Sequence, residues 1–465
     1  MTDSTPPVPA GHSRRWVLLA VGAGTFMSAL DGSVVNAILP VLRTELRTDV
    51  ATIQWVVTVY LLCVSGLLLG FGRLGDARGH KRVYVLGFGG FVVSSVLCGL
   101  APGVEALIAF RALQAVGAAM LLSNSAAILT GSFPPERRGR VLGLQAMMTY
   151  LGLIAGPSLG GWLTQHLGWR SVFYMNLPVG LLAMGLSQRF VPRDAPGARD
   201  EPFDWSGAGL FLTGMVALLL GLNQGHAWGW GSPRIVGLLA GAVVVLGAFL
   251  ALEWRLPVPM LDLSLFRNVT FRMASMTALL NYLCIYSLVF LLPFYLLQAR
   301  GLSPGQAGLL LTAQPVVMMV AAPLSGALSD RIGSRWPAMV GMAVLSGGLL
   351  LLSRLGLSTP LGYVAAGLAV CGLGAGLFIA PNNSALLGAA PRHRQGIASG
   401  VLATSRYAGM ALGVGLARRH LHDDALRTCG AGLGRGPHPG GGPGLPGVLP
   451  RAGHAAHLGL TAQLA

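Results

Sequence analysis

Long apolar stretches dominate this sequence and constrain its fold more than any other feature. A helix needs about 20 predominantly apolar residues to cross a bilayer. Thirteen segments meet this requirement, at residues 16–39, 52–71, 83–101, 105–130, 141–164, 171–189, 206–223, 235–253, 272–297, 305–328, 337–353, 361–385 and 396–416. Charged residues make up 10% of the chain, against about 25% in a soluble globular protein. The sequence therefore predicts an all-α, multi-pass membrane protein.

The formal net charge of +16 is explained by topology. If the N-terminus is cytoplasmic, nineteen basic residues fall in cytoplasmic segments and six in external ones. This is the positive-inside asymmetry of a cytoplasmic (inner) membrane protein. The basic charge therefore predicts orientation in a lipid bilayer, and it does not indicate a nucleic acid partner.

The sequence does not support enzymatic or metal chemistry. Its five cysteines are scattered, without the spacing of a disulfide framework or a metal site. Neither a phosphate-binding loop nor a nucleophile motif stands out. We expect no enzyme activity, no metal and no cofactor.

An internal repeat divides the chain. Residues 72–79 read GRLGDARG, and residues 326–333 read GALSDRIG, each after the second apolar segment of a six-segment unit. Repeats in the same orientation indicate two parallel halves related by an axis along the membrane normal. The predicted divisions are a six-helix half (1–190), a linker with two extra helices (191–260), a second half with five recognisable helices (261–416) and an atypical tail (417–465).

The fifth apolar segment contains the run GLIAGPSLGGWL at residues 152–163. In a helix interior, Gly costs about 1 kcal/mol and Pro about 3 kcal/mol relative to Ala. A span that accepts these costs needs close approach to a neighbouring helix, a bend, or both. Ordinary small-residue packing is the alternative, since such spacings are common in spans. We expect a mechanical role in a helix that moves.

Four motifs together resemble the major facilitator superfamily, in particular its fourteen-span drug:proton antiporter branch. They read LDGSVVNAILP at 30–40, GRLGDARGHKR at 72–82, RALQAVG at 111–117 and GLIAGPSLGG at 152–161. The fourth is the discriminating one, because in the family it marks exporters. It is matched at Gly152, Gly156, Pro157, Gly160 and Gly161. Ala77, His80 and Ala115 are mild departures from the motifs.

The resemblance covers residues 16–416, nearly the whole chain. It implies the major facilitator fold, with two six-helix halves and two extra central helices. It also implies a monomer that exports small amphipathic compounds in exchange for protons, which are the coupling ion in place of any cofactor.

Two charged residues lie inside apolar segments of the first half. Arg111 lies in the stretch LIAFRALQ, and an arginine at a helix centre costs about 2.5–3.5 kcal/mol on insertion scales. The resemblance implies that Arg111 takes part in proton coupling. We hypothesise that Asp31 is a proton-coupling or substrate-facing carboxylate, with Asn36 and Gln114 in the same cavity. The alternatives are an arginine bonded to helix carbonyls and a carboxylate that only accepts packing hydrogen bonds.

The loop after the second segment is predicted to gate the transporter. A carboxylate beside a helix N-terminus and basic neighbours makes a charge latch between adjacent helices. The resemblance implies that this latch holds one conformation and breaks in the other, whereas topology-setting charge alone is the alternative. The predicted gating residues are Gly72, Asp76, Arg78, Gly79, Lys81, Arg82 and Asp330.

The second half of the sequence contains fewer residues that indicate a functional site. Arg406 lies inside the thirteenth segment, where it is either a counterpart to Arg111 or a structural residue whose charge extends toward the interface. The tenth segment has no acidic residue. A divalent cation would favour opposing carboxylates in a low-dielectric cavity. Neutral or monovalent amphipathic substrates are therefore favoured.

The composition changes after Leu416. Residues 417–465 are rich in Gly, Pro, His, Arg and Ala, and no window in them supplies the fourteenth span that the family plan requires. The tail is either a disordered low-complexity segment or the product of a reading-frame shift near residues 415–418. Its histidines are not interpreted as a metal site. Besides a broad drug exporter, a dedicated exporter of one endogenous metabolite and an inactive or sensor remnant therefore stay open.

Overall fold

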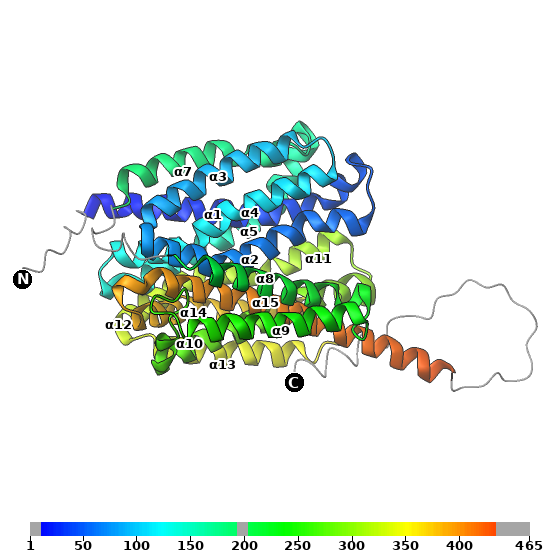
Figure 1. Cartoon of the computed structure of the whole chain (residues 1–465). Helices are drawn as coiled ribbons and strands as arrows, with labels where there is room; N and C mark the ends of the chain where they lie inside the picture. The colour runs from blue at the N-terminus through cyan, green and yellow to red at the C-terminus, as the bar shows by residue number, and fades with distance from the viewer. Residues whose placement is uncertain (1–10, 193–202, 434–465) are drawn as a thin grey trace, which may run out of the picture.

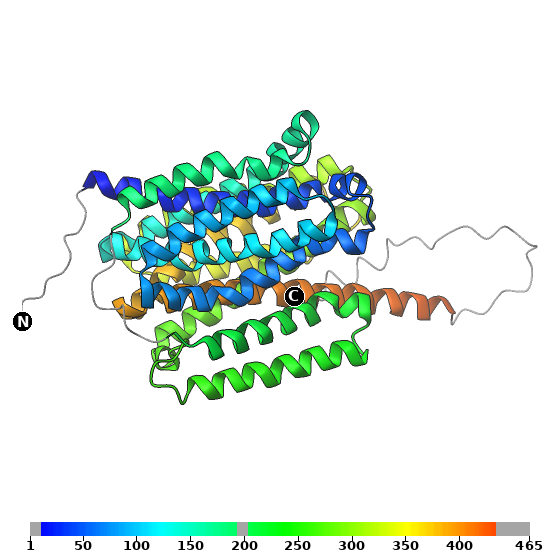
Figure 2. The same cartoon turned by 45° about the horizontal axis from the view of Figure 1, so that its top comes forward.

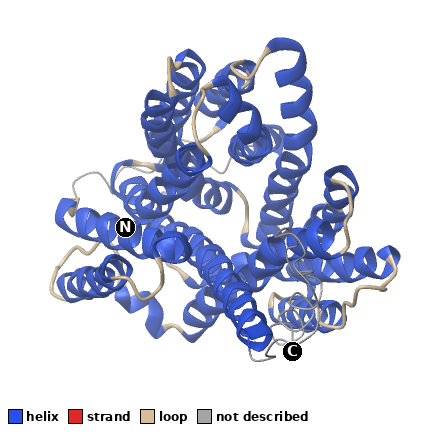
Figure 3. Cartoon of the chain, turned by 90° about the vertical axis from the view of Figure 1, so that its right-hand side faces the viewer, coloured by secondary structure: helices blue, strands red, loops and turns tan. Residues whose placement is uncertain are grey.

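The computed structural model describes residues 11–192 and 203–433. Within these ranges the chain is a bundle of helices without strands, shown end-on in Figure 3. Eleven of the described helices are long and apolar enough to cross a membrane. The predicted all-α membrane fold is confirmed.

The first half of the bundle holds seven helices. They are α1 (Gly11–Glu45), α2 (Val50–Arg78), α3 (His80–Leu100), α4 (Val104–Ser132), α5 (Arg138–Leu167), the short α6 (Ser171–Tyr174) and α7 (Asn176–Phe190). The expected segment 171–189 is thus divided between α6 and α7, so α7 has only 15 residues. In Figure 1 these helices form the blue to blue-green part of the bundle.

The second half begins after the extra helices. It comprises α10 (Val269–Phe294) with the π-helical turn Tyr295–Ala299, α11 (Pro304–Leu311), α12 (Ala313–Ile332), α13 (Arg335–Leu352), α14 (Leu361–Ala389) and α15 (Gln395–Leu433). The expected segment 305–328 is divided between α11 and α12, whose junction lies at Thr312. Every expected apolar segment therefore falls on helix.

The two extra helices are α8 (Trp205–Trp228) and α9 (Pro233–Glu253), on the outside of the bundle in Figure 2. Phe211 and Met215 of α8 are buried in one cluster with Leu62 of α2 and Val401 of α15. Helix α8 therefore covers the seam where α2 of the first half meets α15 of the second.

The last helix is longer than its apolar segment. We expected it to end near Leu416, but α15 continues to Leu433. Hydropathy falls after 416, yet residues 417–429 contain neither Gly nor Pro, so helix formation is not interrupted there. The rest of the predicted tail, 434–465, lies outside the described residues, as do residues 193–202 of the predicted linker.

Candidate functional site

Asp31 and Arg111 meet inside the first half of the bundle. Asp31 comes from α1 and Arg111 from α4, and Arg111 Nη1 donates to Asp31 Oδ2 at 2.6 Å. Both side chains have no solvent exposure. Removing two charges from water is costly, and hydrogen bonds to the remaining polar atoms of the pair offset part of that cost, so its neighbours matter.

Amide donors complete the surroundings of Asp31. Its Oδ1 accepts hydrogen bonds from Gln114 Nε2 at 3.1 Å and from Asn176 Nδ2 at 2.9 Å. Gln114 Nε2 also donates to Ser95 Oγ of α3 at 2.7 Å. The Asp31 carboxylate thus accepts hydrogen bonds from Arg111, Gln114 and Asn176, an arrangement that suits its ionised form.

Arg111 has further partners on α2. Its Nε donates to the Val56 carbonyl oxygen at 3.3 Å, and its guanidinium carbon lies 4.2 Å from the ring centroid of Tyr60. Its Nη2 is buried and has no hydrogen-bond partner among the residues that the structure describes. The structure thus brings together three of the four residues expected in this cavity, together with Ser95, Asn176 and Tyr60.

Asn36 lies outside this cluster. Its side chain is exposed, and residues five apart on a helix are rotated by about 140°, so Asn36 and Asp31 lie on different sides of α1. Sequence analysis did not select Ser95, Asn176 or Tyr60 for the site. The available signal was weak, because single polar residues are common near the ends and on the packed faces of membrane helices.

The fourth motif, GLIAGPSLGG at residues 152–161, is called the antiporter motif below after the branch that it resembles. It lies on α5 and packs against the stretch of α1 that carries Asp31. A Cβ atom added to Gly152 would lie 2.7 Å from the Phe26 carbonyl oxygen, and one added to Gly156 would lie 2.5 Å from the Ser33 Cβ. Gly160 faces Val34 in the same way, whereas an added Cβ on Gly161 would meet nothing within 4 Å. Three glycines at a spacing of four therefore permit close approach of α1 and α5.

Pro157 lies inside α5 and removes one hydrogen-bond donor from the helix. The carbonyl that loses its partner is that of Leu153, four residues earlier. Ser33 Oγ of α1 donates to this oxygen at 2.9 Å. The helix-breaking residue of the motif is thus compensated by the neighbouring helix, as a membrane span requires.

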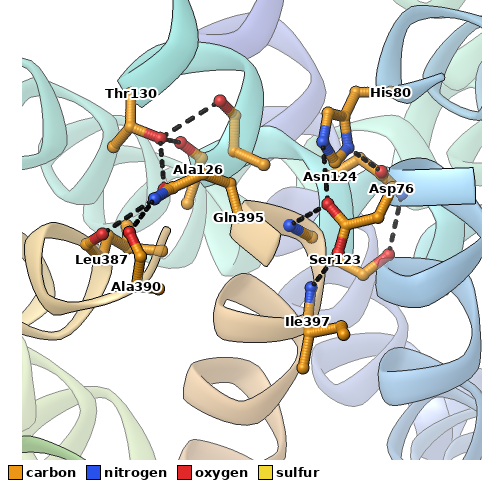
Figure 4. Close-up of polar contacts among 12 residues, drawn as sticks. Asp76, His80, Ser123, Asn124, Ala126, Thr130, Leu387, Ala390, Gln395 and Ile397 are labelled. Carbon is orange, nitrogen blue, oxygen red and sulfur yellow. Dashed lines mark hydrogen bonds and ion pairs between the residues drawn. The ribbon is translucent and has the colours of Figure 1, made fainter. Parts of the chain in front are cut away.

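Asp76 connects the two halves at one end of the bundle. Its carboxylate accepts from the backbone N–H groups of Gly396 at 2.7 Å and Ile397 at 2.8 Å, in the first turn of α15. Figure 4 shows Asp76 between His80 and the start of α15. A helix N-terminus presents unpaired N–H groups and a positive dipole end, which suit an anion.

The repeat produces the same contact a second time. Asp330, at the end of α12, accepts from the backbone N–H groups of Gly139 at 2.7 Å and Arg140 at 2.9 Å in the first turn of α5. We call the contacts of Asp76 and Asp330 with these helix N-termini the double latch. Both carboxylates contact the opposite half, and the double latch therefore closes this end of the bundle.

Glycines permit the halves to approach at the double latch. A Cβ atom added to Gly72 would collide with the Gly396 carbonyl oxygen, and one added to Gly326 would collide with that of Gly139. Gly79 has a φ of +99° where α2 ends, a conformation that favours glycine. Glycine is thus required for close packing at Gly72 and Gly326 and for a positive φ at Gly79.

The basic residues of the predicted gating loop have other positions. Lys81 Nζ donates to the carbonyl oxygens of Gln188 at 2.8 Å and Val191 at 2.6 Å, at the end of α7. Arg78 and Arg82 are exposed. The partners of Asp76 are thus backbone N–H groups of the other half, with His80 Nε2 at 3.3 Å, rather than the basic side chains of its own loop.

His80 and Asn124 support Asp76. The Asn124 amide nitrogen donates to the carbonyl oxygens of Phe71 and Met120, so its Oδ1 is an acceptor. His80 Nδ1, 2.8 Å from this oxygen, therefore carries a hydrogen. Nearby, Thr130 Oγ1 of α4 donates to Gln395 Oε1 at 3.1 Å, a further contact between the halves (Figure 4).

Two repeated halves of membrane-spanning helices, with polar residues enclosed between them, form an architecture that many membrane transporters share. The profile of the Major Facilitator Superfamily matches residues 21–414, and the chain belongs to this superfamily. It is a transporter and not an enzyme, as the sequence predicts.

Known proteins agree with this assignment. The riboflavin transporter RibZ of Clostridioides difficile is 35% identical over 402 residues, which are 86% of this chain and 87% of that protein. The tetracenomycin C resistance and export protein of Streptomyces glaucescens is 32% identical over 409 residues, 88% and 76% of the two chains. The crystal structure of the human organic anion transporter MFSD10 has a TM-score of 0.63 at 17% sequence identity, and the match covers 89% of this chain and 93% of that one. The expected superfamily and its drug-exporting branch are confirmed.

Proposed function

We propose that this protein is a proton-coupled antiporter that exports small amphipathic compounds across the cytoplasmic membrane, with its N-terminus and the double latch on the cytoplasmic side. The observation that carries the proposal is the enclosed pair of Asp31 and Arg111, joined at 2.6 Å. An ionisable pair inside a membrane span is a functional-site hypothesis by default.

Protonation of Asp31 would change its interaction with Arg111. A carboxylate that binds a proton loses its charge attraction to the guanidinium, and one oxygen becomes a donor. Arg111 Nη2 has no partner and lies within the same buried site, so the guanidinium has a free donor with which to form new contacts. Protonation and movement of α4 against α1 are thereby linked.

The packing of α1 and α2 connects this pair with the rest of the bundle. Helix α2 carries Tyr60, which lies under Arg111, and Asp76 of the double latch. Helix α1 carries Asp31 and packs against the antiporter motif of α5. Asp330, in turn, accepts a hydrogen bond from the first turn of α5. A change at Asp31 therefore acts on both helices that the double latch secures, which supports alternating access by rocking of the halves.

Transport in inverted membrane vesicles tests the proposal. A fluorescent amphipathic substrate and a pH-sensitive dye report uptake and proton release together. We expect uptake to follow an imposed pH gradient and to be abolished by a protonophore, but not by ATP depletion with the gradient held constant. Asp31→Asn should abolish the coupling, whereas Glu105→Gln, at an exposed carboxylate in the first turn of α4, should not.

Undiminished proton-driven uptake by Asp31→Asn would remove Asp31 from the mechanism. Transport that depends on ATP and ignores the gradient would contradict proton coupling altogether.

A dedicated exporter of one compound is the second candidate. Its support is that the two relatives described above are named for single compounds, riboflavin and tetracenomycin C. A panel of unrelated amphipathic dyes separates the candidates, because a dedicated exporter moves few or none of them. Absence of transport for every compound, with intact protein in the membrane, would favour an inactive or sensor remnant.

A further inference from the structure

Arg406 lies at the centre of a group of tyrosines. Its guanidinium carbon is 5.7 Å from the ring centroid of Tyr282 and 5.4 Å from that of Tyr407. Tyr282 and Tyr286 in turn pack against the buried cluster that contains Tyr150. We call these five residues the Arg406 cluster.

The Arg406 cluster joins the two halves. Tyr150 comes from α5 of the first half, Tyr282 and Tyr286 from α10, and Arg406 and Tyr407 from α15 of the second. Tyr282 and Tyr286 are four residues apart, so they share one face of α10. The interface between the halves of a transporter of this fold is where substrates bind.

The cluster lies at mid-depth in the bundle. Arg406 is eleven residues after Gln395, where α15 begins beside the double latch, which corresponds to about 16 Å along the helix axis. The hydrocarbon core of a bilayer is about 30 Å thick, so Arg406 lies near its midplane. Its charge is too deep for the headgroups to solvate.

Arg406 has no acidic partner. Among the residues that the structure describes, it forms no ion pair and no hydrogen bond, and its Nε is buried without an acceptor. Arg111, in the other half, has Asp31 beside it. Arg406 therefore retains an uncompensated positive charge and the donors of a planar guanidinium.

We propose that the Arg406 cluster binds the anionic group of an aromatic substrate, with Arg406 pairing the anion and the tyrosine rings stacking on the flat part of the molecule. The proposal deepens the proposed export function and rests on it. A guanidinium presents two parallel N–H groups that match a carboxylate, and hydroxyls from several tyrosines add donors.

A cationic substrate fits this site less well. Tyrosine rings attract cations, but the Arg406 guanidinium already lies within about 6 Å of the rings of Tyr282 and Tyr407. A second cation would lie beside an unpaired positive charge in surroundings of low dielectric, where repulsion is strong. Phe378, Ile379 and Met318 pack in one buried cluster with Tyr150, so apolar side chains adjoin the tyrosines, as in most ligand sites.

Dye binding to the purified full chain tests the proposal. Fluorescein is an anionic xanthene dye, and a rhodamine ethyl ester is a cationic dye on the same ring system. Fluorescence anisotropy gives the dissociation constant of each. We expect the wild type to bind fluorescein at least tenfold more tightly than the rhodamine ester, a difference of about 1.4 kcal/mol.

Three variants assign the preference to Arg406. Arg406→Gln should weaken fluorescein binding at least tenfold, and Arg406→Lys should retain part of it because the charge remains. Arg354→Gln, which removes an exposed positive charge between α13 and α14, should change neither dye. Thermal unfolding checks that each variant is folded, and the comparison of dyes on the wild type needs no variant.

Equal or tighter binding of the rhodamine ester, binding of neither dye, or fluorescein binding unchanged in Arg406→Gln would each overturn the inference. Its failure is separable from failure of the export function. Proton-driven uptake of the rhodamine ester without fluorescein binding would retain antiport and reject the anion site. Arg406-dependent fluorescein binding without proton-driven uptake would retain the anion site and reject antiport.

Discussion

The hydroxyl of Ser33 donates to the carbonyl oxygen of Leu153, the acceptor that Pro157 leaves unpaired inside α5. This one contact explains how a proline persists in the middle of a membrane span. It also attaches the antiporter motif to α1 two residues after Asp31, so any movement of α5 would act directly on the helix that carries the buried carboxylate.

Removing the Ser33 hydroxyl should destabilise the protein only while Pro157 is present. Ser33→Ala leaves the Leu153 carbonyl without a partner, and interhelical hydrogen bonds in membrane proteins contribute about 0.6 kcal/mol on average, up to about 1.7 kcal/mol. Pro157→Ala restores the donor within α5. A double-mutant cycle by denaturant titration should therefore show coupling, and strictly additive single changes would contradict this interpretation.

The glycines of the motif should differ in their tolerance of a methyl group. Gly156→Ala places a Cβ at 2.5 Å from the Ser33 Cβ, so α1 and α5 must separate, whereas Gly161→Ala meets nothing within 4 Å. We expect Gly156→Ala to lower thermal stability and transport rate several-fold, and Gly161→Ala to resemble the wild type. Equal effects of the two substitutions would show that helix contact is not the reason for glycine.

The double latch should set the conformational equilibrium. Asp76→Asn and Asp330→Asn replace charge-assisted hydrogen bonds to helix N-termini with neutral ones, which are about half as strong. Spin labels introduced by Arg78→Cys and Arg392→Cys, both at exposed sites, would report the separation of the halves at this end.

Each substitution should increase the population with a long distance between the labels, and the double substitution should increase it further. Asp262→Asn is the control, because Asp262 lies near this end but pairs with Arg394 at 3.8 Å and not with a helix N-terminus of the first half. Unchanged distance distributions in both latch variants would show that other contacts keep this end closed.

Arg111→Lys should abolish coupled transport although the charge is kept. The guanidinium contacts Asp31 and the Val56 carbonyl oxygen with different nitrogens and lies over the Tyr60 ring. An ammonium group is compact and cannot make these contacts together. Vesicle uptake measures the loss, and Arg78→Lys, at an exposed position, is the matched control. Wild-type uptake by Arg111→Lys would show that only the charge matters.

Part of the site was predictable from the sequence because charged and amide groups are expensive inside a span. Asp31, Arg111 and Gln114 stand out in apolar segments for this reason, and the structure joins them. Asn36 was selected through its place in the first-helix motif but lies on a different side of α1, since a motif specifies positions and not the helix face that packs inward.

The partners of Asp76 could not be read from the sequence. They are the backbone N–H groups of Gly396 and Ile397, and every residue except proline carries such a group, so no residue type marks it. The same holds for the Leu153 carbonyl, whose partner Ser33 is 120 residues away.

The sequence by itself determined the membrane location, the helices, the repeat and the buried charges, because these follow from the free energy of placing each side chain in lipid. Only the tertiary structure decided which charge is compensated and which is not. Arg111 has Asp31 within 2.6 Å, whereas among the residues that the structure describes Arg406 has tyrosines beside it and no acidic partner. That difference depends on how helices distant in the chain pack together, and helix packing is set by contacts that no single segment contains.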